Sequence, residues 1–208
     1  PAGQQYTARP CAFKKQDPQD VLCAAFVPGS KGARVATGHD RGAVLLWEGT
    51  ECVRAVLGCH GGRPVRCLRP LPGGAGLASG GGDGTIRAWP AAKGRLTGES
   101  AVVGGAPGFE RVLAFDVDAV AETAVCVTGS RSVWQVPLGN GETQPRLLVR
   151  GHVGDVWGVA WSPSEPGVFA VAADQERVPV RDASRRSLLG AVQLRHPYPA
   201  RARAVAWA

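Results

Sequence analysis

The chain has 208 residues and a formal net charge of +7, and 44% of its residues are hydrophobic. Residues 1–20 lack the apolar stretch of a signal peptide and no run of 18 apolar residues occurs, so we expect a soluble, intracellular protein without a membrane-spanning helix. The 29 glycines and 16 prolines separate short apolar runs, and no window keeps a helical period. This pattern favours an all-β fold over a helical one.

The apolar runs recur in units of similar design. The two clearest copies end at Trp47 and Trp89, which lie 42 residues apart, and self-similarity at this period is typical of propeller blades. Each copy contains several short β-like runs joined by tight turns, which is how a propeller blade is built. We therefore predict a partial β-propeller of about four four-stranded blades and the first strand of a fifth.

In chain order, we predict a lead-in segment over residues 1–19 and a propeller region over 20–208. Blades are expected at 20–57, 64–103, 111–150 and 151–194, with the start of the next at 201–208. In the first blade, strands are expected at 20–26, 33–38, 43–47 and 52–57. In the second, they are expected at 64–69, 76–80 and 85–89, and less clearly within 96–103. In the third, they are expected at 111–117, 123–128 and 132–136. The fourth blade is expected to place strands at 155–161, 168–172 and 177–182, and 203–207 is predicted as the inner strand of a fifth.

A polar pattern accompanies the repeat: a histidine near the start of a blade, a hydroxyl residue on the second strand, an aspartate in the following turn and a tryptophan on the third strand. Buried polar groups stabilise a fold only when each has a hydrogen-bond partner, so we expect these residues to form one network. The set is most complete in the second unit, which is predicted to be the best-ordered blade. Its expected members are His60, Ser79, Asp83 and Trp89, and partial sets elsewhere comprise Asp40, Trp47, Trp134, His152 and Asp174.

The fourth unit departs from this pattern. Arg181 stands where the blade tryptophan is expected, and Pro179 lies inside the same strand. Because proline removes a donor from the strand ladder, we predict that this blade is distorted. Its best candidate pair for a network is His152 with Asp174.

Histidine, serine and aspartate are also the members of a hydrolase triad, so a catalytic alternative exists. A set that recurs with the blade period is typical of a structural device, whereas an active site usually occurs once. The chain has no nucleophile elbow, phosphate-binding loop or HExxH motif, and the run from Gly80 to Gly84 indicates a hairpin turn. We therefore predict no catalytic residue and no enzyme activity.

The cysteines predict no special site either. They form no CxxC pair and no metal-ligand spacing with histidine, and several lie inside apolar runs, which is typical of reduced, buried thiols. We expect no metal, no cofactor and no small-molecule substrate. The six positions are Cys11, Cys23, Cys52, Cys59, Cys67 and Cys126.

The net charge of +7 is compatible with an anionic partner. The basic residues are mostly scattered singly, which equally fits a solvated surface, and no aromatic residues are interleaved with the terminal arginines, which disfavours nucleic-acid binding. Charge alone makes four residues candidates for partner binding: Lys14, Lys15, Arg185 and Arg186.

Three segments resemble the echinoderm-microtubule-associated-protein-like family of WD-repeat proteins, in the first propeller of its tandem propeller module. The most specific is 148–160, where Gly151-His152 and then Asp155-Val-Trp-Gly-Val-Ala160 are similar to the family's Gly-His-x-x-Glu/Asp-Leu/Val-Trp-Gly-Leu-Ala. Residues 9–26 resemble a stretch in which Pro, Phe and Lys-Lys precede Gln and a Leu-Cys strand. The run from Gly80 to Gly84, followed by Trp89, matches the family's Ser-Gly-Gly-x-Asp-Gly turn. The resemblance implies a WD40-type propeller.

The resemblance also implies a non-enzymatic scaffold that binds tubulin or microtubules and contributes to microtubule organisation, in the cytoplasm, on the cytoskeleton or in the cilium. A basic surface would be attracted to the acidic surface that tubulin is expected to present. The alternative is a generic WD40 protein–protein adaptor, such as a ubiquitin-ligase substrate receptor or a ciliary assembly scaffold, because fold alone does not settle function.

Overall fold

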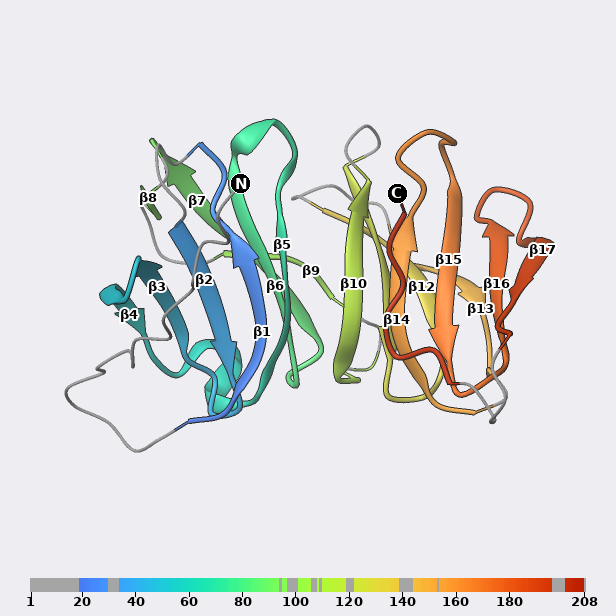
Figure 1. The fold of residues 1–208 in the computed structure, drawn as a ribbon, viewed down its shortest axis with the longest axis horizontal. Coiled ribbons are helices and arrows are strands. Elements are labelled where there is room, and N and C mark those ends of the chain that lie inside the picture. The colour runs from blue at the N-terminus through green and yellow to red at the C-terminus, as the bar shows by residue number, and fades with distance from the viewer. Residues whose placement is uncertain are drawn as a thin grey trace, which may run out of the picture.

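The computed structural model describes residues 19–29, 34–93, 95–96, 101–105, 108, 110–118, 122–138, 144–152, 154–195 and 201–207. In these residues the chain forms 17 strands, arranged in four antiparallel sheets, and two short 3-10 turns at Cys59–Gly62 and Pro72–Gly74. Figure 1 shows the sheets standing side by side, with β1, β5, β10 and β14 next to one another. The predicted all-β propeller architecture is confirmed.

The first two sheets follow the chain order. The first contains β1 (Val21–Phe26), β2 (Arg34–His39), β3 (Val44–Glu48) and β4 (Glu51–Val56). The second contains β5 (Val65–Pro70), β6 (Gly76–Gly81), β7 (Thr85–Ala92), β8 (Arg95–Leu96) and β9 (Ala101–Gly105). Both β8 and β9 pair with β7, so the outer position that was unclear from the sequence is divided between two strands.

The other two sheets have four strands each, again in sequential order. The third contains β10 (Val112–Asp118), β11 (Thr123–Thr128), β12 (Val133–Pro137) and β13 (Arg146–Val149). The fourth contains β14 (Val156–Trp161), β15 (Val168–Ala173), β16 (Arg177–Asp182) and β17 (Ser187–Gln193). Pro179 pairs with Ala191 of β17, but the pairing of β16 with β15 covers only Val180–Asp182, so this ladder ends next to the proline.

One backbone hydrogen bond recurs in every sheet and lets the four repeats be aligned residue by residue. The first turn residue after each second strand donates its N–H to the carbonyl of the residue just before each inner strand. The donor and acceptor pairs are Asp40 and Asp20 at 3.1 Å, Gly82 and Pro64 at 2.9 Å, Gly129 and Arg111 at 3.0 Å, and Asp174 and Asp155 at 2.9 Å. These four turn residues therefore occupy equivalent positions.

The core lies between neighbouring sheets. Trp89 of β7 is 1% exposed and belongs to one apolar cluster with Val44 and Leu46 of β3. Every residue of β6 is buried because the first sheet covers one of its faces and the third sheet covers the other. Every residue of β15 is also buried, and Phe169 and Val171 pack against the third sheet. The propeller is thus held together by contacts between sheets, since a single sheet cannot bury both of its faces.

The segment 201–207 differs from its expectation as an inner strand. It carries no strand pairing, although it runs beside β14, as Figure 1 shows. The N–H of Ala202 donates to the carbonyl of Ala173 at 3.2 Å, and the Trp207 indole donates to the carbonyl of Ala160 at 3.2 Å. A strand needs a neighbour whose backbone pairs with it, and none of the described segments forms such a ladder with 201–207.

Second strands approach the next sheet so closely that a side chain is excluded at one position. A Cβ on Gly80 would lie 2.8 Å from Phe115 Cδ1 and 2.9 Å from Val112 Cγ1, both on β10. The equivalent Gly38 would place a Cβ 2.7 Å from Val65 Cγ1 on β5. Both contacts are shorter than van der Waals separation, so glycine sets the spacing between the first three sheets.

We predict that Gly80→Ala lowers the free energy of unfolding by about 1–3 kcal/mol, because the added methyl overpacks the contact between the second and third sheets. Denaturant unfolding of the two proteins measures the difference. The matched control is Gly190→Ala in β17, where a Cβ would meet no atom within 4 Å. Equal stability of the two variants would contradict this account of the spacing.

Candidate functional site

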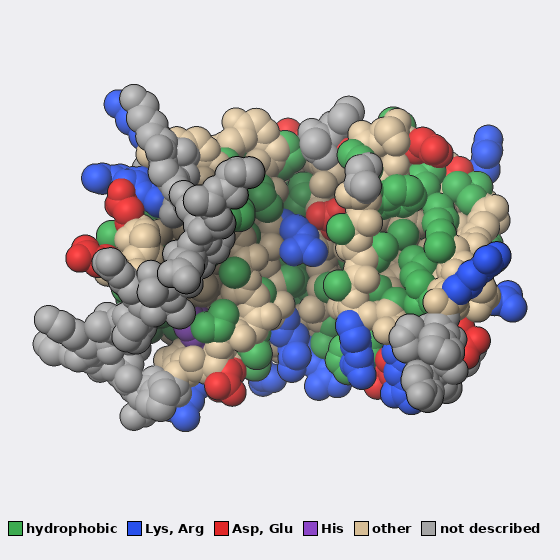
Figure 2. All heavy atoms as spheres, in the orientation of Figure 1, with side chains coloured by type: hydrophobic (Ala, Val, Ile, Leu, Met, Phe, Trp, Pro, Cys, Tyr) green, Lys and Arg blue, Asp and Glu red, His purple; other side chains and the backbone are tan. Residues whose placement is uncertain are grey.

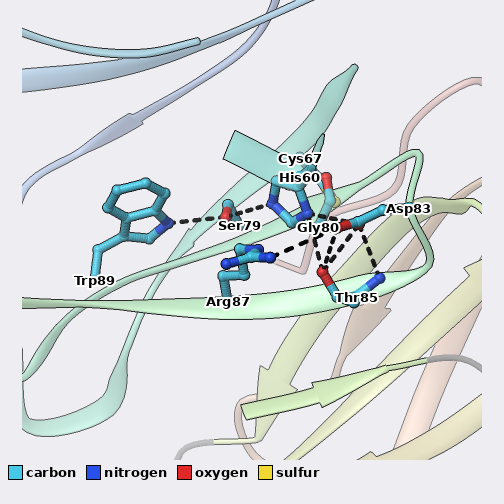
Figure 3. A network of polar contacts seen from close by, with 8 residues as sticks. All are labelled: His60, Cys67, Ser79, Gly80, Asp83, Thr85, Arg87 and Trp89. Carbon is cyan, nitrogen blue, oxygen red and sulfur yellow. Dashed lines mark hydrogen bonds and ion pairs between the residues drawn. The ribbon is translucent and has the colours of Figure 1, made fainter. Parts of the chain in front are cut away.

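The second sheet carries a buried polar network, drawn in Figure 3. His60 lies in the 3-10 turn between β4 and β5 with a left-handed backbone (φ 54°), and it is fully buried. Its ring fits because Gly81 has no side chain: a Cβ there would lie 2.3 Å from His60 Cγ. The loop before β5 and the end of β6 are therefore shaped to receive one imidazole ring.

Three hydrogen bonds join the network from one end to the other. The Trp89 indole N–H donates to Ser79 Oγ at 2.8 Å. Ser79 Oγ lies 2.8 Å from His60 Nε2, and His60 Nδ1 lies 2.7 Å from Asp83 Oδ1. A carboxylate only accepts, so Nδ1 carries the ring proton, and Nε2 is left to accept from the Ser79 hydroxyl. The donors run in one direction, from Trp89 to Asp83.

Asp83 is held in place by Thr85 on β7. The Thr85 backbone N–H donates to Asp83 Oδ1 at 3.0 Å, and its hydroxyl lies 2.9 Å from both carboxylate oxygens. Arg87 approaches the second oxygen at 4.0 Å. The carboxylate therefore has several fixed partners, as a residue that positions a buried histidine requires.

The electrostatics favour a neutral imidazole beside an ionised carboxylate. Burial lowers the pKa of His60, and the hydrogen bond to Asp83 only partly opposes this effect. Desolvation raises the pKa of Asp83, but the bonds from Thr85 and His60 outweigh it and hold the pKa below its ordinary value. Ser79 and His60 are both fully buried, so this hydroxyl has no contact with solvent.

The first sheet builds a shorter version of the network. The Trp47 indole donates to Thr37 Oγ1 at 2.8 Å, and Thr37 Oγ1 lies 2.9 Å from Nε2 of His39. His39 occupies the position equivalent to Gly81, so a ring from β2 itself reaches the hydroxyl instead of a ring from a preceding loop. Asp40 stands one residue before the position of Asp83, and it accepts from the backbone N–H of Asp20 at 3.2 Å.

The third sheet has lost the network. Register places Cys126 opposite Trp134, as Ser79 is opposite Arg87, so Trp134 does not occupy the position of Trp89. That position belongs to Val136, two residues further along β12. Trp134 therefore does not take the network position that was expected of it. It lies on the same face of its strand as the tryptophan position but two residues before it.

The fourth sheet keeps the histidine but not its partners. His152 is buried, and its Nε2 has no hydrogen-bond partner. Asp174 is equivalent to Gly82, one residue before the position of Asp83, and it accepts from the indole of Trp157 at 2.8 Å. The expected pairing of His152 with Asp174 is thus absent, because the turn aspartate faces the inner strand β14.

The charge-based candidates are not brought together with these networks. Arg185 and Arg186 lie in the exposed turn between β16 and β17, where Arg185 approaches Asp182 at 3.8 Å. Lys14 and Lys15 fall outside the described residues.

Burial raises the pKa of the Cys23 thiol to about 11 and that of the Cys126 thiol to about 12. These thiols stay protonated at neutral pH and are weak nucleophiles.

Across the described ranges, no group of three or more histidine, cysteine, aspartate or glutamate side chains is arranged to hold a metal ion. None of the helices in those ranges has the length and apolarity needed to cross a membrane.

We predict that Asp83→Ala lowers the free energy of unfolding by about 1–3 kcal/mol, because it removes the carboxylate that accepts from the buried Nδ1–H of His60 and leaves only the Thr85 hydroxyl, 3.1 Å away, as an acceptor. Thermal and denaturant unfolding measure the change. Asp40→Ala is the matched control, since Asp40 accepts from a backbone N–H at the surface of its turn. A loss in Asp83→Ala no larger than that in Asp40→Ala would refute a special role for the second network.

Comparison with known proteins adds to this geometry. A family model described as WD domain, G-beta repeat, matches residues 51–90 and 143–176. Echinoderm microtubule-associated protein-like 2 of Homo sapiens is 32% identical to the chain over 176 residues, which cover 83% of this chain and 25% of that protein. The proteins of the same name from Rattus norvegicus and Mus musculus are 29% and 30% identical over the same shares. The chain thus spans about a quarter of the length of these relatives.

Among solved structures, the β-propeller domain of Myceliophteria thermophila Cps50 (Swd1) matches with a TM-score of 0.63 at 12% identity. The match covers 88% of this chain and 60% of that one, and at this identity it shows the fold alone. The repeat match includes the loop and strands that hold His60, Ser79, Asp83 and Trp89. Propeller sheets, matched repeats and similarity over most of the chain agree: the chain is a WD-repeat propeller that is similar to the echinoderm-microtubule-associated-protein-like proteins.

Proposed function

We propose that the chain contributes to a non-enzymatic scaffold that binds tubulin or the microtubule lattice and helps to organise microtubules. The observation that carries the proposal is the similarity over 83% of the chain to proteins named as microtubule-associated. The buried network supports a scaffold because its serine and histidine stabilise the sheet and are closed to a substrate. A cytoplasmic, cytoskeletal location belongs to the same proposal.

The fold gathers exposed arginines that are scattered along the sequence. The edge where β1, β5, β10 and β14 begin also carries the turns between second and third strands, and Figure 2 shows Lys and Arg side chains along this lower edge. We call it the arginine edge. Its exposed members are Arg41, Arg63, Arg111, Arg131, Arg150, Arg177 and Arg201.

Carboxylates moderate the charge of the arginine edge. Arg131 pairs with Asp155 at 3.0 Å, and Arg201 approaches Asp174 at 3.7 Å. Exposed ion pairs of this kind contribute little to stability, so their arginines remain available to a partner. An acidic protein surface such as that expected of tubulin would be attracted to this edge, and salt would weaken the attraction.

We predict that the chain pellets with microtubules, and that its affinity falls at least about threefold between low and physiological ionic strength. The double variant Arg63→Glu/Arg111→Glu, which reverses two charges on the arginine edge, should weaken binding further and flatten the salt dependence. The matched control is Lys93→Glu/Arg95→Glu, which makes the same charge change at the opposite end of the second sheet. Co-pelleting at a series of salt concentrations measures all three proteins.

Binding that is absent, or that is insensitive to salt and to both double variants, would contradict the proposal. In that case, recovery of a ubiquitin-ligase subunit instead of tubulin with the bound chain would favour the general adaptor function.

A further inference from the structure

The fourth sheet contains two buried polar groups that have lost their common partner. Register places Arg181 opposite Phe169, as Trp89 is opposite Leu77, so the arginine stands at the tryptophan position. Val171 stands at the position of Ser79, where it offers no hydroxyl. His152 Nε2 and Arg181 Nε are accordingly buried without a hydrogen-bond partner, whereas the equivalent groups of the second sheet meet on Ser79 Oγ.

The same replacement accompanies a hollow beside β16. Trp89 fills its site so fully that it is 1% exposed, while the fourth sheet has a cavity of about 330 Å³ between the end of β13 and the strands β16 and β17. Three of the described residues lining the cavity are arginines and none is acidic. The polar lining comprises Arg150, His152, Gln175, Arg177 and Arg181.

The three arginines give this site a positive potential, and two of its buried donors, Arg181 Nε and His152 Nε2, have no hydrogen-bond partner. Arg181 is half-buried in the wall, whereas Arg150 and Arg177 are exposed. A guanidinium donates hydrogen bonds and accepts none, so the unpaired Arg181 Nε requires an acceptor. Burial, with the nearby charge of Arg181 as a smaller cause, lowers the pKa of His152, so the ring is neutral at pH 7 and can donate from Nε2 in one tautomer.

We propose that this hollow binds an oxyanion, a phosphate or carboxylate group, which accepts hydrogen bonds from Arg181 and His152 while Arg150 and Arg177 attract it to the opening. Charge-assisted hydrogen bonds from arginine to an oxyanion are the strong class of such bonds, and the planar guanidinium suits both groups. The proposal does not depend on microtubule binding, because it rests on the cavity and on the two buried groups without partners that line it.

The test follows the arginine side-chain N–H signals of the isotopically labelled chain by NMR during titration with inorganic sulfate, with chloride at equal ionic strength as the reference. Arg181→Trp introduces the residue type of the first two repeats and fills the hollow, so it should weaken sulfate binding at least about tenfold, as loss of a charged hydrogen-bond donor does. Arg95→Trp, in the second sheet, makes the same change at an exposed position and should bind sulfate as the unmodified chain does.

His152→Phe provides a second variant if Arg181→Trp does not fold, and it should also weaken binding because the phenyl ring offers no hydrogen-bond donor in place of the imidazole. Parallel titrations with inorganic phosphate and with a short glutamate peptide identify the group: tighter phosphate binding indicates a phosphate site, and tighter peptide binding indicates a carboxylate site. An unmodified chain that responds to sulfate, phosphate and the peptide no more than to chloride would overturn the proposal. So would an Arg181→Trp or His152→Phe variant that folds and binds as tightly as the unmodified chain.

Discussion

The Ser79 hydroxyl is the group on which the best-preserved repeat depends. It accepts a hydrogen bond from the Trp89 indole and donates one to His60. It therefore joins β7, which carries Trp89, to the loop before β5, which carries His60. A hydroxyl can do both at once, which neither a carboxylate nor an ammonium can. Because Trp89 also packs against the first sheet, the same contact ties hydrogen bonding within a sheet to packing between sheets.

The other repeats show the effect of changing members of this network. The first sheet supplies its histidine from β2, at the position that Gly81 keeps open in the second. The third replaces the hydroxyl with the thiol of Cys126 and relies on apolar packing. The fourth replaces serine with Val171 and tryptophan with Arg181, which leaves donors without acceptors next to a cavity. Loss of a structural network in one blade can thus produce a surface that is able to bind, while the remaining sheets preserve the fold.

Much of this fold is predictable from the sequence because strand spacing and turn residues act locally. The 42-residue spacing of Trp47 and Trp89 locates two sheets correctly. Single side chains are harder to place, because register decides which residues meet: Asp40 and Asp174 stand one residue before the position of Asp83, and Trp134 lies two residues from the tryptophan site. His39 was missed, although Thr37 precedes Trp47 by the same ten residues that separate Ser79 from Trp89, an alignment that puts His39 at Gly81. The arginines lie on one edge because of how the four sheets are arranged, and amino-acid composition alone does not predict that arrangement.

The most direct measurement of the central claim is the protonation state of the His60 ring, read from the two ring nitrogen resonances of the labelled chain at pH 7. A directed chain of donors from Trp89 through Ser79 to Asp83 requires a neutral imidazole that carries its proton on Nδ1. That tautomer, with a slowly exchanging Nδ1 proton, is the result that the account predicts. A proton on Nε2, or a ring that exchanges between tautomers as a free histidine does, would contradict it.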